Sequence, residues 1–177
     1  MIPTNYIVAF VIMAAVIATA AFFAARGWNK RSTQQASKLV QPSQTLSGTQ
    51  LSSERFTDLY YVATTYTDDP LNRVSAFGLG ARGKAELHIT KDGILIERQG
   101  ETSLALSQHA IVKVTTTQAT IDRGVEKDGL IQIEWLSQQL ESKPDVSLST
   151  FIRVVSTDAR KDLLNKLEAL IKKEAVK

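Results

Sequence analysis

The first 25 residues of the chain form an apolar run without a single charged side chain, and 21 of them are apolar. As a helix that rises about 1.5 Å per residue, the run reaches about 37 Å and can cross a hydrocarbon core of about 30 Å. A lone segment in lipid satisfies its backbone only as a helix. We therefore predict a transmembrane helix anchor over residues 1–28, with Tyr6 and Trp28 near the two interfaces.

The charges that follow the run predict its orientation. Residues 26–53 contain no acidic side chain and four basic ones, which are Arg26, Lys30, Arg31 and Lys38. Because Lys and Arg beside a span favour the cytoplasmic side, we expect a single-pass plasma membrane protein with the N-terminus outside and the C-terminal domain in the cytoplasm. The alternative is a cleaved signal and an extracytoplasmic domain. Ala18-Thr19-Ala20 resembles a cleavage triplet, but the basic residues follow the apolar run instead of preceding it.

Small residues on one stripe of the predicted helix give a second, weaker signal. They are Ala14, Ala18, Ala21 and Ala25. This spacing lets two helices approach closely in a bilayer, so it is compatible with a homo-oligomer.

The composition of the rest excludes several classes of protein. The sequence pI of about 9.2 would suggest an acidic partner, yet residues 54–177 carry 17 basic and 18 acidic side chains. The basicity therefore belongs to the segment after the apolar run, and we expect no nucleic-acid partner. The chain contains no Cys, which excludes a disulfide scaffold, a Cys-ligated metal and a thiol nucleophile.

Residues 29–55 are polar and lack a sustained helical or strand period, with six Ser, five Gln and three Thr. This composition predicts a flexible linker with a root-mean-square span of roughly 30 Å. The alternative is that part of the segment packs on the following domain as an irregular arm.

Residues 56–177 are predicted to form one domain of seven antiparallel strands followed by one helix. Alternating apolar residues and turn signals place the strands at about 59–66, 85–90, 94–98, 102–106, 109–121, 131–135 and 148–155. Lys91-Asp92-Gly93 is a predicted hairpin turn. The spacing of Leu163, Leu167 and Leu170 predicts an amphipathic helix with Ser156 or Thr157 as its N-cap. This fold class is mainly β with one C-terminal α-helix, a small barrel or sandwich.

Seven strands and a closing helix are the order of the pleckstrin-homology (PH) superfold, and several segments carry a closer resemblance. They are the lone N-terminal span, Gly80–Ala85, Thr90–Ile94, Leu130–Trp135 and Phe151–Arg153. On these segments the chain resembles actinobacterial membrane proteins with a PH-like domain, often labelled export, transporter or membrane proteins. The resemblance implies a PH-like barrel or sandwich and brings no catalytic residue or cofactor.

Few residues suggest chemistry. Residues 78–83 match G-x-G-x-x-G, but a predicted strand follows instead of the helix that binds phosphate, so we expect a simple glycine-rich loop. Arg73, Arg82 and Lys84 lie near the first hairpin opening, where PH domains that bind phosphoinositides hold phosphates, and are weak candidates for anion or lipid contact. His88 and His109 belong to no recognisable catalytic or metal-ligand spacing. We therefore predict no catalytic residue, no cofactor and no metal.

The sequence thus favours a membrane-anchored, non-catalytic PH-like interaction or scaffold module that faces the cytoplasm and brings a protein partner to the lipid bilayer. Two alternatives stay open, an accessory subunit of a transport or export complex and a module that binds anionic lipid head groups.

Overall fold

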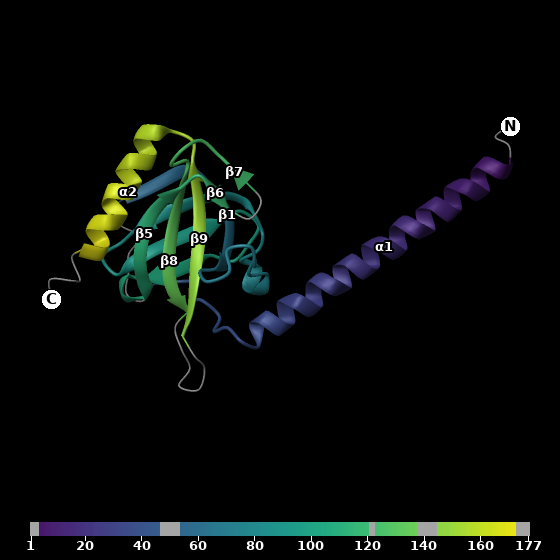
Figure 1. Cartoon of the computed structure of the whole chain (residues 1–177), viewed down its shortest axis with the longest axis horizontal. Helices are drawn as coiled ribbons and strands as arrows, with labels where there is room; N and C mark the ends of the chain where they lie inside the picture. Colours follow the sequence, from purple (N-terminus) through teal and green to yellow (C-terminus); the bar gives the residue numbers. More distant parts are fainter. Residues whose placement is uncertain (1–3, 47–53, 121–122, 138–144, 173–177) are drawn as a thin grey trace.

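The computed structural model describes residues 4–46, 54–120, 123–137 and 145–172. It begins with helix α1 (Thr4–Ala36), which projects from the β domain as a single rod (Figure 1). The most apolar 18-residue window of α1 has no residue buried within the chain, and Phe22 and Phe23 are 63% and 64% exposed. α1 is thus long and apolar enough to cross a membrane, a property that a signal sequence near an N-terminus shares.

Seven strands form one antiparallel sheet in the order β4-β3-β2-β1-β9-β8-β5. The strands are β1 (Glu54–Tyr66), β2 (Gly83–Ile89), β3 (Gly93–Arg98), β4 (Leu104–Ser107), β5 (Ile111–Thr117), β8 (Leu130–Ser137) and β9 (Val146–Val154). A separate short ribbon pairs β6 (Ala119–Thr120) with β7 (Arg123–Gly124). β1 is central because its 13 residues pair with β2 along the first part and with β9 along the second.

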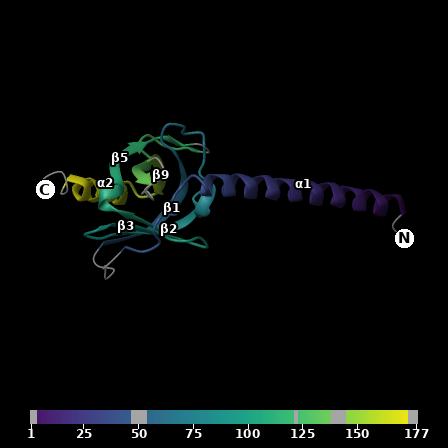
Figure 2. The same ribbon diagram turned by 90° about the horizontal axis from the view of Figure 1, so that it is seen from below.

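The long sheet bends into two layers, one made of β1 to β4 and the other of β5, β8 and β9 (Figure 2). It is not closed, because β4 and β5 are its two edges. The predicted fold class, seven strands followed by one helix in a PH-like arrangement, is confirmed in its sandwich form. Alternate apolar residues face the space between the layers, and Leu87, Ile96 and Ile133 are fully buried there. Each such side chain contributes about 1.5–3 kcal/mol to folding.

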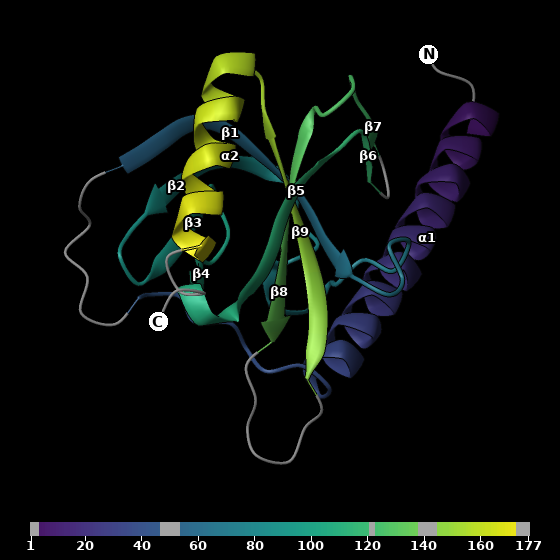
Figure 3. The same cartoon turned by 60° about the vertical axis from the view of Figure 1, so that its left-hand side comes forward.

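Helix α2 (Thr157–Lys172) lies across the sandwich and closes one of its ends (Figure 3). Leu163, Leu167 and Leu170 are the residues that it buries in the core, as their spacing predicts. The hydroxyl oxygen of Ser156 accepts a hydrogen bond from the backbone N–H of Ala159 at 3.3 Å, which confirms Ser156 as the N-cap.

A chain of buried hydrogen bonds joins the two layers. The Tyr61 hydroxyl lies 2.6 Å from the hydroxyl of Thr64, which lies 2.7 Å from that of Thr150. The Thr150 oxygen also accepts the indole N–H of Trp135 at 2.9 Å. Burial raises the pKa of Tyr61 to about 12, so this group stays a neutral phenol. These hydrogen bonds satisfy the polar groups of Tyr61, Thr64, Trp135 and Thr150 and help to fix the pairing of β1, β9 and β8.

Several element boundaries differ from the predicted ones. β1 begins at Glu54 and not near Leu59, because its first residues pair with the end of β2. The predicted strand 109–121 consists of a 3-10 turn (η2, Gln108–Ala110), β5 and the short β6. The Lys91–Gly93 turn is confirmed, since it joins β2 directly to β3. Local periodicity does not detect pairing with a distant strand, which decides where a strand starts and ends.

The segment predicted as a linker packs on the domain over part of its length. Helix α1 continues to Ala36, and Leu39 is 3% exposed within the hydrophobic core. Farther on, the carbonyl oxygen of Ser43 accepts a hydrogen bond of 2.8 Å from the backbone N–H of Ala105, which lies on the edge strand β4. The residues that follow α1 therefore pack as an irregular arm, the alternative to a flexible linker. The edge strand of a sheet favours this, because its unpaired backbone groups can form hydrogen bonds with an extended polar segment. Residues 47–53 of the predicted linker lie outside the described part.

Candidate functional site

The site begins with an irregularity in the central strand. Phe56 pairs with Leu87 and Leu59 pairs with Ala85, so two residues of β1, Thr57 and Asp58, face one residue of β2. Asp58 adopts a φ of 57°, in the left-handed region that Asp tolerates better than most side chains. A bulge of this kind bends its strand and often lies next to a binding site.

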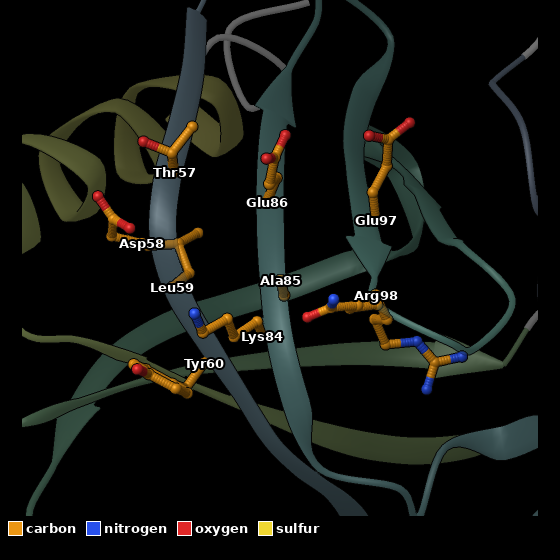
Figure 4. Close-up of a pocket in the computed structure, with 10 residues that line it drawn as sticks. Thr57, Asp58, Leu59, Tyr60, Lys84, Ala85, Glu86, Glu97 and Arg98 are labelled. Atoms are coloured by element: carbon orange, nitrogen blue, oxygen red, sulfur yellow. The ribbon is translucent and has the colours of Figure 1, made fainter.

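Beside the bulge, a pocket of about 490 Å³ opens on the outer face of β1, β2 and β3 (Figure 4). The side chains that line it from this face are Thr57, Asp58, Tyr60, Lys84, Glu86 and Glu97. Lys84 extends from β2 toward β1, while Glu97 projects from β3 at the opposite side. Tyr60 is 40% exposed. The pocket therefore combines one aromatic surface with charges of both signs, which suits a polar partner better than an apolar one.

The acidic side of the pocket continues into a cluster that we call the β2–β3 triad, made of Glu86, His88 and Glu97. One potential donor atom from each lies within 4.8 Å of the other two. Glu86 and Glu97 are directly opposite on neighbouring strands, and His88 Nε2 lies 3.3 Å from Glu97 Oε2. The guanidinium of Arg55 donates to Glu86 Oε2, at 2.8 Å from its Nε.

Sequence reasoning missed the triad because it considered each histidine with its chain neighbours only. The sequence predicts His88 and Glu86 on the same strand and a hairpin turn at Lys91–Gly93. Combining the two would have revealed the triad. A two-residue hairpin loop sets the register, and in that register Glu86 faces Glu97. His109 lies in η2 and is exposed, away from this cluster.

The three predicted anion contacts are divided between two places. Arg73 and Arg82 lie in the loop between β1 and β2, whereas Lys84 lines the pocket. Arg73 is half-buried and donates to the Gly80 carbonyl at 3.0 Å. Burial lowers the pKa of Arg73, and the nearby positive charge of Arg82 lowers it further. Arg73 therefore holds the loop together through the Gly80 carbonyl, whereas Arg82 is exposed.

The same loop receives the end of α1. Gln35, 8% exposed, accepts hydrogen bonds at its Oε1 from the Ser75 N–H at 2.6 Å and the Ser75 hydroxyl at 2.7 Å. Its Nε2 donates to the Arg73 carbonyl at 3.0 Å. One turn earlier, Arg31 donates to Asn72 Oδ1 at 2.8 Å. Among the four basic residues predicted to set the topology, Arg31 thus contacts the domain, and Arg26, Lys30 and Lys38 are exposed.

The glycine-rich motif at 78–83 has the structure of a loop. It follows a short 3-10 turn (η1, Ala76–Gly78), and β2 begins at Gly83. The carbonyl oxygen of Gly78 accepts a hydrogen bond from the guanidinium of the buried Arg98 at 2.7 Å, so it is directed toward this side chain inside the domain. A strand after the loop leaves no helix N-terminus to bind phosphate there, as the sequence predicts.

The family comparison agrees with the strand order and the closing helix. The model of the bacterial PH domain-like family matches residues 39–168, more than two thirds of the chain. Among curated proteins, none matches. The matched range starts at Leu39, the arm residue buried in the core, and ends within α2. The chain belongs to the bacterial PH domain-like family.

Proposed function

We propose that the chain is a membrane-anchored PH-like interaction module, without catalytic activity of its own, whose domain faces the cytoplasm. One observation carries the proposal, the docking of the end of α1 on the domain through Gln35 and Ser75. The same continuous helix is long and apolar enough to span a bilayer. Since both ends of α1 are then fixed, the helix acts as a short stalk that holds the domain in one orientation.

Helix geometry gives the distance between domain and bilayer. The apolar run ends at Ala25, and Gln35 lies ten residues later, which corresponds to about 15 Å along the axis. The polar layer of a bilayer adds about 5–8 Å to each side of the hydrocarbon core. The docked domain therefore lies next to the head groups, with Arg26 and Lys30 inside or close to that layer.

The pocket lies toward the end of the domain that is remote from α1. β1 starts at Glu54, which pairs with Lys166 of α2, and ends at Tyr66, whose N–H binds the Asn72 carbonyl in the loop that receives α1. The bulge at Thr57 and Asp58 belongs to the first part of the strand. A partner that binds there meets no steric conflict with the bilayer, which supports a cytoplasmic protein as the ligand.

Reporter fusions test the orientation. We expect a green fluorescent protein fused after Lys177 to fluoresce and an alkaline phosphatase fused at the same position to be inactive, because Arg26, Lys30, Arg31 and Lys38 keep the C-terminal side in the cytoplasm. The intact mass of the purified chain should include the apolar run. An active phosphatase fusion, or a chain shortened after Ala20, would overturn this part of the proposal.

Photo-crosslinking from Tyr60 tests the pocket as the binding surface. A benzoylphenylalanine at this position should give one discrete protein adduct in native membranes, and Lys84→Glu should reduce it several-fold by reversing the charge beside Tyr60. The matched control is the same probe at Val112 on β5, which is 53% exposed against 40% for Tyr60. Equal adducts at both positions, or an adduct with lipid alone at Tyr60, would contradict a protein ligand in the pocket.

A further inference from the structure

Surface ion pairs alone do not account for the arrangement of the β2–β3 triad, which is made of Glu86, His88 and Glu97. Two carboxylates directly opposite on neighbouring strands repel each other and destabilise the pairing. Arg55 offsets one of them, and both of its contacts go to the same oxygen, Oε2 of Glu86. With a neutral imidazole, the two carboxylates and Arg55 leave a net charge of −1 at this place.

His88 does not complete the network as a hydrogen-bond donor. Its Nε2 is buried from solvent and has no hydrogen-bond partner among the described residues. Glu97 Oε2 lies 3.3 Å away, within ion-pair distance, but the pair lacks hydrogen-bond alignment. The side chain is only 15% exposed. A buried imidazole nitrogen that has no hydrogen-bond partner among the described residues, and that lies close to two carboxylates, has the surroundings of a metal ligand.

We propose that the β2–β3 triad is a binding site for a divalent metal ion of the Zn²⁺ type. One imidazole nitrogen and two carboxylate oxygens are ligands that Zn²⁺ accepts, at about 2.0–2.2 Å each. Purely oxygen-binding ions such as Mg²⁺ and Ca²⁺ would make little use of the imidazole. The present spread of up to 4.8 Å between donor atoms closes to a coordination sphere by rotation of Glu97, which is 46% exposed.

The placement of the triad gives the ion a defined surrounding. Glu86 and Glu97 line the pocket, whereas His88 lies one position farther along β2 on the same face. Three protein ligands leave a fourth position for water or for a donor from whatever occupies the pocket. The ion would also join β2 to β3 and remove the repulsion between the two carboxylates.

The composition of the chain makes the test unusually clear. With no Cys and only two His, Zn²⁺ has few competing ligands, and the imidazole signals of His88 and His109 can be assigned with one variant each. The protein is the full chain in detergent, carrying a streptavidin-binding tag and no His tag. Titration with ZnCl₂ is followed by calorimetry and by ¹⁵N spectra of the imidazoles, and MgCl₂ serves as the comparison ion.

We expect one Zn²⁺ per chain and a large change in the His88 ring signals, with Mg²⁺ at least tenfold weaker. His88→Gln and Glu97→Gln should each weaken Zn²⁺ binding at least about tenfold, since even the outer partners of metal ligands change affinity 10–100-fold. His109→Gln should bind as the wild type does. Circular dichroism without metal checks that each variant folds. If His88→Gln does not fold, Glu97→Gln alone tests the proposal.

Three results would overturn the proposal. One is the absence of Zn²⁺ binding below about 1 mM, an affinity too weak for a specific site. Another is binding of equal strength in wild type and Glu97→Gln. The third is a Zn²⁺-induced change at His109 with His88 unaffected. Each would identify the triad as a set of ion pairs in which His88 and Glu97 interact without a metal.

Discussion

Replacing Gly93 by alanine should lower the free energy of unfolding of the domain by about 3–5 kcal/mol, the range in which single substitutions become severe. Gly93 begins β3 with a φ of 149°, a conformation that L side chains rarely adopt. A Cβ would lie 2.9 Å from Ser107 Cα and 3.0 Å from Gln108 N, and closer still to the Leu106 carbonyl. All three contacts are backbone atoms of β4 and its end, so no side chain can rotate away to make room.

The measurement is urea denaturation of the full chain, followed by the fluorescence of the buried Trp135 in a Trp28→Phe background. Gly100→Ala is the matched control. Gly100 has a φ of 81°, but a Cβ there meets nothing within 4 Å, so only the backbone strain of about 1–2 kcal/mol is expected. Equal losses in the two variants would show that strain, and not the close approach of β4 to β3, determines the stability of this hairpin.

The fold was largely predictable because its signals are local. Alternation within single strands, the Asp92–Gly93 turn and the leucine spacing of α2 each reflect residues a few positions apart. Such patterns identify the elements and their order, and that order is shared by the PH superfold. The hairpin at Gly93 also fixes the register between β2 and β3, so the neighbours of Glu86 and His88 follow from it.

The remaining features depend on contacts between distant segments. Nothing local indicates that Asp58 takes a left-handed conformation, since the bulge lies just before Leu59, where β1 begins to pair with β9 while it still pairs with β2. The pocket follows from that bulge and was missed with it. Likewise, the polar stretch after α1 resembles a flexible tether in composition, whereas Gln35 and Leu39 are buried against the domain.

The predicted anion contacts illustrate the same limit at the level of single residues. Arg73, Arg82 and Lys84 are neighbours in sequence near one hairpin, and sequence spacing alone cannot separate their roles. The structure gives Arg73 a structural hydrogen bond to Gly80 and directs Lys84 into the pocket on the outer face. Whether the exposed Arg82 contacts an anion stays a prediction.

Gln35→Leu should uncouple α1 from the domain while leaving both folded. Leucine has nearly the volume of glutamine, but it leaves the Ser75 N–H and the Arg73 carbonyl without their buried partner, at a cost of about 1–3 kcal/mol for each group. The other described hydrogen bonds between α1 and the loop come from Ser32 and from the exposed Arg31. They are too few to offset the loss, so the docked orientation should give way to a broad set of orientations.

Distances between spin labels measure this directly, because the absence of native Cys lets two cysteines be introduced at Lys30 and Lys91, both exposed. Double electron–electron resonance on the full chain in lipid nanodiscs should give a narrow distance distribution for the wild-type background and one at least twice as broad for Gln35→Leu. Gln34→Leu is the matched control, with the same exchange at the preceding, exposed position. If Gln35→Leu keeps the narrow distribution, or if Gln34→Leu broadens it equally, the hydrogen bonds of Gln35 do not orient the domain, and the stalk role assigned to α1 fails with them.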